Sequence, residues 1–143
     1  MNDIPGRVLV HQVNCQGVMG AGLAKEIKTR YPRAFTQYRK FCQPDSNPKL
    51  KPGMIQMVRI DPMLWICNLA GQDRYGRDKR YTDYKAVEVA LKKLHQWHQQ
   101  HLELDIIIPL NMGCSNAGGD WSIVSKLIED NCPEAKITKD IFQ

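Results

Sequence analysis

The sequence predicts one α/β domain over residues 1–143, folded as a three-layer α/β/α sandwich with a mixed central sheet. Apolar, strand-like segments alternate with amphipathic helical segments, which is typical of domains whose helices cover both faces of a sheet. Hydrophobic residues make up 43% of the 143 residues, which is enough for one core. No linker, repeat or low-complexity tract divides the chain, so we expect a single domain.

The first half of the chain predicts one strand, two helices and a pair of strands. Arg7 to Val13 is short, rich in β-branched residues and ends at turn residues, which indicates a buried strand. Helical periodicity runs from Ala21 to Tyr31 and, after a proline, from Ala34 to Cys42. The strands Met54 to Ile60 and Leu64 to Ala70 are joined by a very short connection, so we expect them to pair antiparallel.

The second half alternates helix and strand. We expect one amphipathic helix from Tyr84 to His101 and another from Trp121 to Asn131. Between them, Leu104 to Leu110 is almost wholly apolar, which is typical of a central strand covered on both faces. A last strand is expected within Ala135 to Phe142. Helical crossovers between strands predict parallel neighbours, and the antiparallel pair makes the sheet mixed.

The charge of the chain suits an anionic ligand. Lys and Arg total 20 against 15 Asp and Glu, for a net charge of +5. The basic residues are dispersed. The string "GRDKR" carries three of them (Arg77, Lys79 and Arg80) within one polar loop, Gly71 to Asp83. Solvated surfaces explain most of this excess. A nucleic-acid-binding domain, whose affinity would fall steeply with salt, is therefore the weakest function that we consider.

The sequence predicts no metal site and no cofactor. The five cysteines are scattered without zinc-type spacing, so we interpret them as free thiols. His95, His98 and His101 share one predicted helix near Glu103, which we interpret as a helix face rather than a zinc site. No run of about 18 apolar residues occurs, and the N-terminal segment has no secretory pattern. We expect a cytoplasmic monomer that does not contact membranes.

Two glycine-rich loops carry the strongest functional signal. The first glycine loop, Asn14 to Gly22, and the second glycine loop, Asn111 to Asp120, each follow an apolar strand and precede a helix. Helix N-termini favour phosphate through free N–H groups, and strand ends of this kind meet at one edge of the sheet. The spacing matches neither a Walker loop nor a dinucleotide fingerprint. The alternatives are two ordinary turns or a cradle for the diphosphate of a nucleotide-like ligand.

The strings "HQVNCQGVMGAGLAKEIKTRYP" and "GCSNAGGDWSIVSKLIED" resemble the macrodomain family over nearly the whole chain. The resemblance is closest to phage-encoded macrodomains and to ADP-ribose-1″-phosphate phosphatases of the fungal type. It implies ADP-ribose binding, with Asn14 beside the distal ribose. It further implies that the first glycine loop wraps the distal ribose and the diphosphate through Gly17, Met19, Gly20, Ala21 and Gly22. The second glycine loop would bind phosphate through Gly113, Cys114, Ser115, Asn116, Ala117, Gly118 and Gly119.

The sequence also departs from that family pattern. Asp3-Ile4 is a candidate remnant of the turn that contacts adenine in that family, but it stands several residues too close to the strand Arg7 to Val13. The strand that precedes this turn in the family is therefore shortened or missing here, and we do not rely on Asp3 for adenine recognition. Gly71-Gln72 stands where some hydrolytic relatives carry a lysine, and Ala117 stands where they carry an aspartate. We therefore do not expect their lysine-adduct mechanism. Cys15 and Cys114 lack a nearby base in sequence, so we interpret them as loop members rather than nucleophiles.

Three residues are candidates for catalysis. His11 stands three residues before Asn14, as in the phosphatase branch, and histidine ordinarily titrates near neutral pH, where it can serve as general acid or base. The alternative is a core histidine. Asp73 in the polar loop is a candidate to orient a water molecule, and Asp120 is either catalytic or a helix N-cap. Three functions remain open: a hydrolase acting on ADP-ribose-1″-phosphate or an ADP-ribosylated macromolecule, a non-catalytic ADP-ribose reader, and the nucleic-acid-binding domain.

Overall fold

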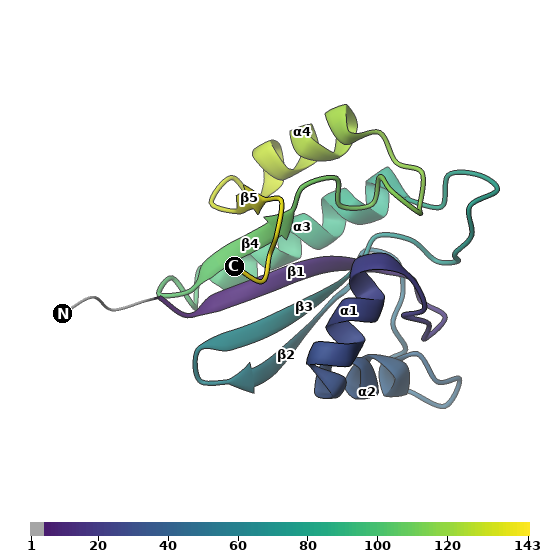
Figure 1. Ribbon diagram of the computed structural model, residues 1–143, viewed down its shortest axis with the longest axis horizontal. Coiled ribbons are helices and arrows are strands. Elements are labelled where there is room, and N and C mark those ends of the chain that lie inside the picture. Colours follow the sequence, from purple (N-terminus) through teal and green to yellow (C-terminus); the bar gives the residue numbers. More distant parts are fainter. Residues whose placement is uncertain (1–4) are drawn as a thin grey trace.

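The computed structural model describes residues 5–143 and has three layers (Figure 1). A five-stranded sheet in the order β2-β3-β1-β4-β5 packs against α1 and α2 on one face and α3 and α4 on the other. The elements are β1 (Arg7–Val13), α1 (Gly22–Arg30), α2 (Pro32–Phe41), β2 (Ile55–Asp61), β3 (Leu64–Ala70), α3 (Tyr84–His98), β4 (Asp105–Pro109), α4 (Trp121–Asn131) and β5 (Lys136–Thr138). The predicted α/β fold with a mixed sheet is confirmed.

The pairing of the strands brings the ends of β1 and β4 together. β1 is parallel to both β3 and β4, and β5 is parallel to β4, whereas β2 is antiparallel to β3. The antiparallel pair is the one predicted from its short connection. Because β1 and β4 are parallel neighbours, the two glycine loops that follow them begin at the same edge of the sheet (Figure 1).

Side chains of β1 alternate between the two faces of the sheet, as a strand requires. Val8 and Val10 pack into the core beneath α3 and α4, whereas Leu9 packs with Ile27 of α1 on the opposite face. His11 follows Leu9 in this alternation and is likewise buried. The strand therefore delivers one histidine to the α1 side, directly before the first glycine loop.

The largest differences between the element boundaries and the sequence predictions are at two helices. α2 begins at Pro32 rather than Ala34, because proline fits the first helical position, where no N–H bond is needed. α3 ends at His98 rather than His101, and the chain then turns through bonds from His101 N–H to His98 O and from Leu104 N–H to His101 O. These turns reverse the chain into β4.

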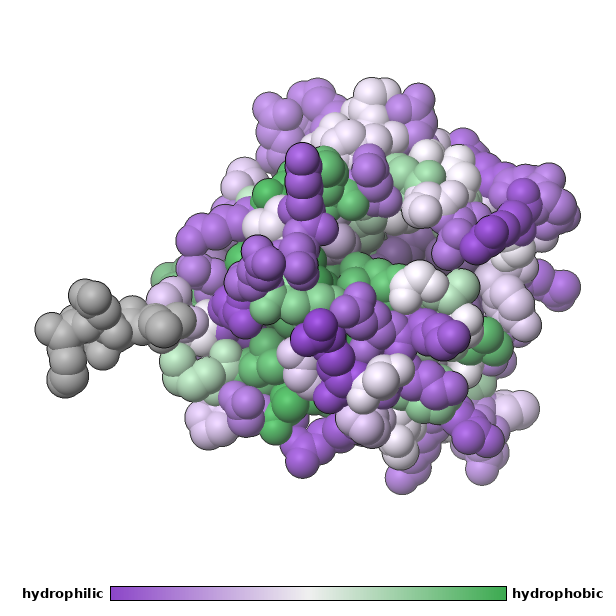
Figure 2. Space-filling view, viewed as in Figure 1, coloured by the Kyte–Doolittle hydropathy of each residue, from purple (hydrophilic) through white to green (hydrophobic). Residues whose placement is uncertain are grey.

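Two further expectations concern the surface and the start of the chain. Within the described part of the chain, no helix has both the length and the apolar character needed to cross a membrane. Hydrophilic side chains cover most of the face in Figure 2, with apolar groups gathered toward its middle. The candidate remnant of an adenine-contacting turn, Asp3-Ile4, lies outside the described residues.

Candidate functional site

The two glycine loops meet at one edge of the sheet, as predicted. A Cβ atom on Gly22, at the end of the first glycine loop, would lie only 3.2 Å from Asn116 Nδ2 of the second. A cavity of about 380 Å³ is lined by both loops and by the end of β4. The surface is hollowed between α1 and the loop that follows β4 (Figure 2). The edge of the sheet at which β1 and β4 end therefore carries a concave site.

A second cavity of about 340 Å³ adjoins the first. It is lined on its own side by Asn14, Val18, Gly20 and Tyr75, among others. The two cavities share four lining residues: Gln12, Ala21, Ala24 and Gln72. Together they form one cleft of the size range usual for small-molecule sites.

The structure divides the predicted site residues into two groups. Those that line the cleft are His11, Asn14, Gly20, Ala21, Gly113, Ser115, Asn116 and Ala117. Those that line neither cavity are Gly17, Met19, Gly22, Cys114, Gly118, Gly119, Asp73 and Asp120. Met19 is 2% exposed and packs with Tyr38 in the core beneath the loop, so its side chain supports the loop from below.

The first glycine loop is organised by the side chain of Asn14. Asn14 Oδ1 accepts from the Gln16 N–H at 2.9 Å and from the buried Tyr38 hydroxyl at 2.7 Å. Asn14 Nδ2 donates to Val18 O at 2.8 Å. The amide therefore closes the loop on itself, while Asn14 remains in the wall of the second cavity.

The second glycine loop is closed through its glycines. Gly119 N–H donates to Gly113 O at 2.9 Å, and a Cβ on Gly119 would lie 2.6 Å from that same oxygen. Gly113 has φ of +75°, a conformation that residues with a side chain rarely adopt. The loop thus depends on glycine for its turn and for its closure.

The polar loop, Gly71 to Asp83, joins the two glycine loops. Cys15 N–H of the first loop donates to Asp73 O at 2.8 Å, and Tyr81 N–H donates to Ala117 O of the second at 2.8 Å. The exposed Asp73 carboxylate accepts from Gln16 Nε2 at 3.1 Å. Asp73 therefore sits at the rim beside the first glycine loop rather than in the cleft wall.

His11 lies in the wall of the first cavity with one free ring nitrogen. Asn68 Nδ2 donates to Gln56 Oε1 at 3.0 Å and lies 3.4 Å from Ala34 O, so Asn68 Oδ1 faces His11. His11 Nε2 therefore carries the proton and donates to Asn68 Oδ1 at 2.5 Å. His11 Nδ1 is then an acceptor, buried and without a partner among the described residues.

The electrostatics of His11 differ from those of an ordinary histidine. Burial disfavours the imidazolium and lowers the pKa of His11 to about 4, against the opposing effect of the Asn68 hydrogen bond. The expectation of a near-neutral pKa is wrong for this reason. At neutral pH the ring is uncharged and offers a lone pair, not a proton, at Nδ1.

Asp120 occupies the N-cap position of α4. Its carboxylate accepts from Ser122 N–H at 2.9 Å and from the Ser122 hydroxyl at 2.7 Å. These hydrogen bonds lower the pKa of Asp120. The geometry is that of the capping alternative rather than of a group facing the cleft.

A pair of variants distinguishes the two roles of Asp120. We expect Asp120→Ala to lower the Tm by about 3 °C through loss of the cap, and Asp120→Asn to keep most of the stability because asparagine caps equally well. Thermal unfolding measures the Tm of both variants, and a turnover assay measures their activity. Loss of turnover in Asp120→Asn at unchanged Tm would contradict a purely capping role.

Neither cysteine near the cleft is a thiolate. Burial raises the pKa of Cys15 to about 12 and that of Cys114 to about 11. Both thiols donate to backbone carbonyls, Cys15 to Gln72 O and Cys114 to Met112 O. Their environments disfavour nucleophilic chemistry.

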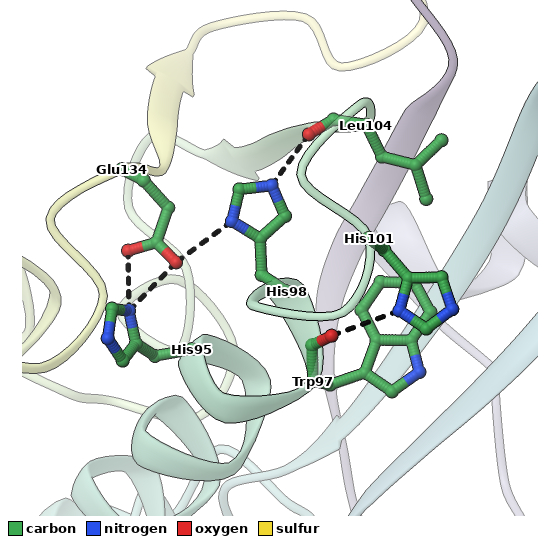
Figure 3. A network of polar contacts seen from close by, with 6 residues as sticks. All are labelled: His95, Trp97, His98, His101, Leu104 and Glu134. Atoms are coloured by element: carbon green, nitrogen blue, oxygen red, sulfur yellow. Dashed lines mark hydrogen bonds and ion pairs between the residues drawn. The ribbon is translucent and has the colours of Figure 1, made fainter.

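The histidine-rich end of α3 forms a hydrogen-bonded cluster (Figure 3), and none of the residues in it lines either cavity of the cleft. His95 Nδ1 lies 2.9 Å and His98 Nδ1 3.1 Å from Glu134, while His98 Nε2 lies 2.7 Å from Leu104 O. The acid that joins the histidines is thus Glu134 and not Glu103. In residues 5–143, no group of three or more His, Cys, Asp or Glu side chains has the arrangement of a metal site.

Sequence reasoning missed several residues of the cleft. Gln12, Leu23, Ala24, Gln72 and Leu110 line it, although none was predicted to. Gln12 carried the one available signal, because it is a polar residue near the end of a mostly apolar strand.

Comparison with known proteins shows which proteins the chain resembles. No family model matches it. A curated relative from Mycobacterium bovis, named "DNA ADP-ribosyl glycohydrolase", is 28% identical over 118 residues, which cover 82% of this chain and 32% of the relative. The macrodomain of Thermus aquaticus DarG superposes with a TM-score of 0.76 at 25% identity, over 94% of this chain and 89% of that one. The chain has the macrodomain fold.

Two further similarities concern what relatives of this chain act on or bind. An Aspergillus clavatus "ADP-ribose 1''-phosphate phosphatase" is 53% identical over 42 residues, covering 29% of this chain and 21% of the relative. Thermosipho africanus DarTG, solved in complex with ADP-ribose, has a TM-score of 0.76 at 21% identity, over 92% of this chain and 36% of that one. The chain thus spans about a third of the length of the mycobacterial relative. Its distant relatives are hydrolases that process ADP-ribose.

Proposed function

We propose that this chain binds ADP-ribose in the cleft between the two glycine loops and hydrolyses an ADP-ribose derivative there. The observation that carries the proposal is a set of residues that line the first cavity and have unpaired backbone N–H groups. Among residues 5–143, no acceptor meets the backbone N–H groups of Ala21, Ser115, Asn116 and Ala117. Unpaired N–H groups of residues around a cavity, next to the N-terminus of α1, suit a diphosphate.

The charge of the cleft supports an anionic ligand. None of the described residues that line either cavity is Asp or Glu, so no carboxylate in the wall repels a diphosphate. The chain as a whole carries a net charge of +5. The two joined cavities offer separate space for two ends of an elongated ligand such as ADP-ribose.

For catalysis, two groups differ in what they can contribute. His11 lines the first cavity, and its buried Nδ1 is a lone-pair acceptor that is unpaired among the described residues, suited to hold a water molecule. The Asp73 carboxylate lies at the rim, held by Gln16, where it is suited to orient water toward the distal ribose. In either reaction one water molecule is consumed. Attack at phosphorus releases inorganic phosphate, and attack at C1″ releases the macromolecule.

The test is turnover of both substrate types by the purified chain. We expect hydrolysis of ADP-ribose-1″-phosphate or of ADP-ribosylated DNA, and a fall of roughly 100-fold in kcat for Asp73→Asn, as for loss of one positioned acid or base. Gln43→Glu, on the surface beyond α2, serves as a neutral control. Absence of turnover on both substrates with intact ADP-ribose binding would overturn the hydrolase proposal.

That last outcome corresponds to the second candidate, a non-catalytic ADP-ribose reader. The observation that favours it is the scarcity of titratable groups in the cleft: His11 and Tyr75 are the only ones among the described lining residues. Burial keeps His11 neutral near pH 7. Calorimetry with ADP-ribose beside the turnover assay separates the reader from the hydrolase.

A further inference from the structure

Gln12, at the carboxyl end of β1, is a polar side chain of the cleft to which the proposed function gives no role. Its Nε2 donates to Gln72 Oε1 at 2.8 Å and to Thr82 Oγ1 at 2.9 Å. Gln72 and Thr82 stand at the two ends of the polar loop. A single amide therefore ties both ends of that loop to the central strand of the sheet.

The direction of each hydrogen bond in this network is fixed. The Thr82 hydroxyl donates to Gly113 O at 2.6 Å, so toward Gln12 it can only accept. Gln72 Nε2 donates to Arg74 O at 2.8 Å, which turns Gln72 Oε1 toward Gln12. Gln12 must supply both protons, and a side chain without an NH₂ group cannot replace it.

The space around Gln12 is shaped to receive its amide. Cβ atoms built on Gly71 and on Gly113 would each lie 2.5 Å from Gln12 Oε1. That oxygen is buried and has no hydrogen-bond partner among the described residues. An unpaired buried acceptor destabilises the fold, and the two hydrogen bonds made by Gln12 Nε2 act against this cost.

We propose that Gln12 is a positioning residue that clamps the polar loop over the cleft. The loop carries Tyr75 in the wall of the second cavity and Asp73 at its rim. Through Thr82 and Gly113, the clamp also fixes the second glycine loop relative to β1. The effect on ligand binding rests on the proposed function, because it requires that the cleft be the ADP-ribose site. The effect on the loop itself does not.

Gln12→Glu is the decisive variant, since it keeps the shape of the side chain but sets an acceptor against two acceptors. We expect amide hydrogen exchange of residues 72–82 to rise about tenfold, and the Kd for ADP-ribose to rise by a similar factor. Both increases should be smaller at acid pH, where the introduced carboxyl group is protonated and regains one donor. Gln96→Glu on the exposed face of α3 adds the same charge and should change neither quantity.

Exchange of the polar loop that is unchanged in Gln12→Glu would overturn the clamp. If the wild-type chain does not bind ADP-ribose, the proposed function fails while the exchange measurement still decides the clamp. A second route uses Gly71→Ala, whose added methyl group would displace Gln12. It should raise amide hydrogen exchange of the same loop. The double variant Gly71→Ala with Gln12→Ala should show no more exchange there than Gln12→Ala alone. Additive effects of the two changes would count against the proposal.

Discussion

Gly20→Glu is expected to abolish ADP-ribose binding while the fold is retained. Gly20 lines the second cavity, and a Cβ there would meet only Val18 Cγ1, at 3.6 Å. The position does not have a positive φ, so a side chain is tolerated. Two like charges about 4 Å apart near a protein surface repel by about 4 kcal/mol, so we expect the Kd to rise by at least about 100-fold.

Two variants at the same position separate charge from volume. Gly20→Gln has nearly the same size as Gly20→Glu and no charge, and Gly20→Ala adds only a methyl group. Calorimetry at equal salt, with thermal unfolding of each variant, measures the effect. If Gly20→Glu kept wild-type affinity, the cleft between the glycine loops would not be the site of an anionic ligand.

Local sequence patterns predict most of the fold, because the spacing of apolar residues in each segment matches the helix or strand that the segment forms. The strand Arg7–Val13 and the helix Trp121–Asn131 were predicted to the residue, since alternation, capping and turn residues all coincide there. The meeting of the glycine loops followed from parallel strands alone. By contrast, the end of α3 depended on turns after His98 that no glycine or proline announces.

The composition of the cleft wall was less predictable, because it depends on which way individual loop residues face. Met19 and Gly20 are neighbours in sequence, yet Met19 is buried beneath the loop and Gly20 lines the cavity. The partner of His95 and His98 is Glu134, which is 36 residues away from His98 along the chain. Such pairings follow from tertiary packing and leave no local pattern.

Folding stability should fall steeply between about pH 6.5 and pH 4 because of His11. The unfolded chain binds a proton on this histidine below its ordinary pKa of 6.5, whereas burial holds the folded pKa at about 4. In that interval the unfolded state carries more protons, so stability increases with pH and is lost as the pH falls. A shift of this size corresponds to about 3 kcal/mol in the free energy of unfolding.

His11→Gln isolates this contribution, because glutamine can still donate to Asn68 Oδ1 but does not titrate. Denaturant unfolding of both proteins gives their free energies of unfolding between pH 7 and pH 4. The value for the wild type minus that for His11→Gln should decrease by about 3 kcal/mol over this interval. Parallel pH profiles would contradict the burial of an uncharged ring.

The same measurement limits what His11 can contribute to the chemistry. A ring that stays neutral down to about pH 4 acts at neutral pH only as an acceptor, so any proton given to a leaving group must come from another group or from water.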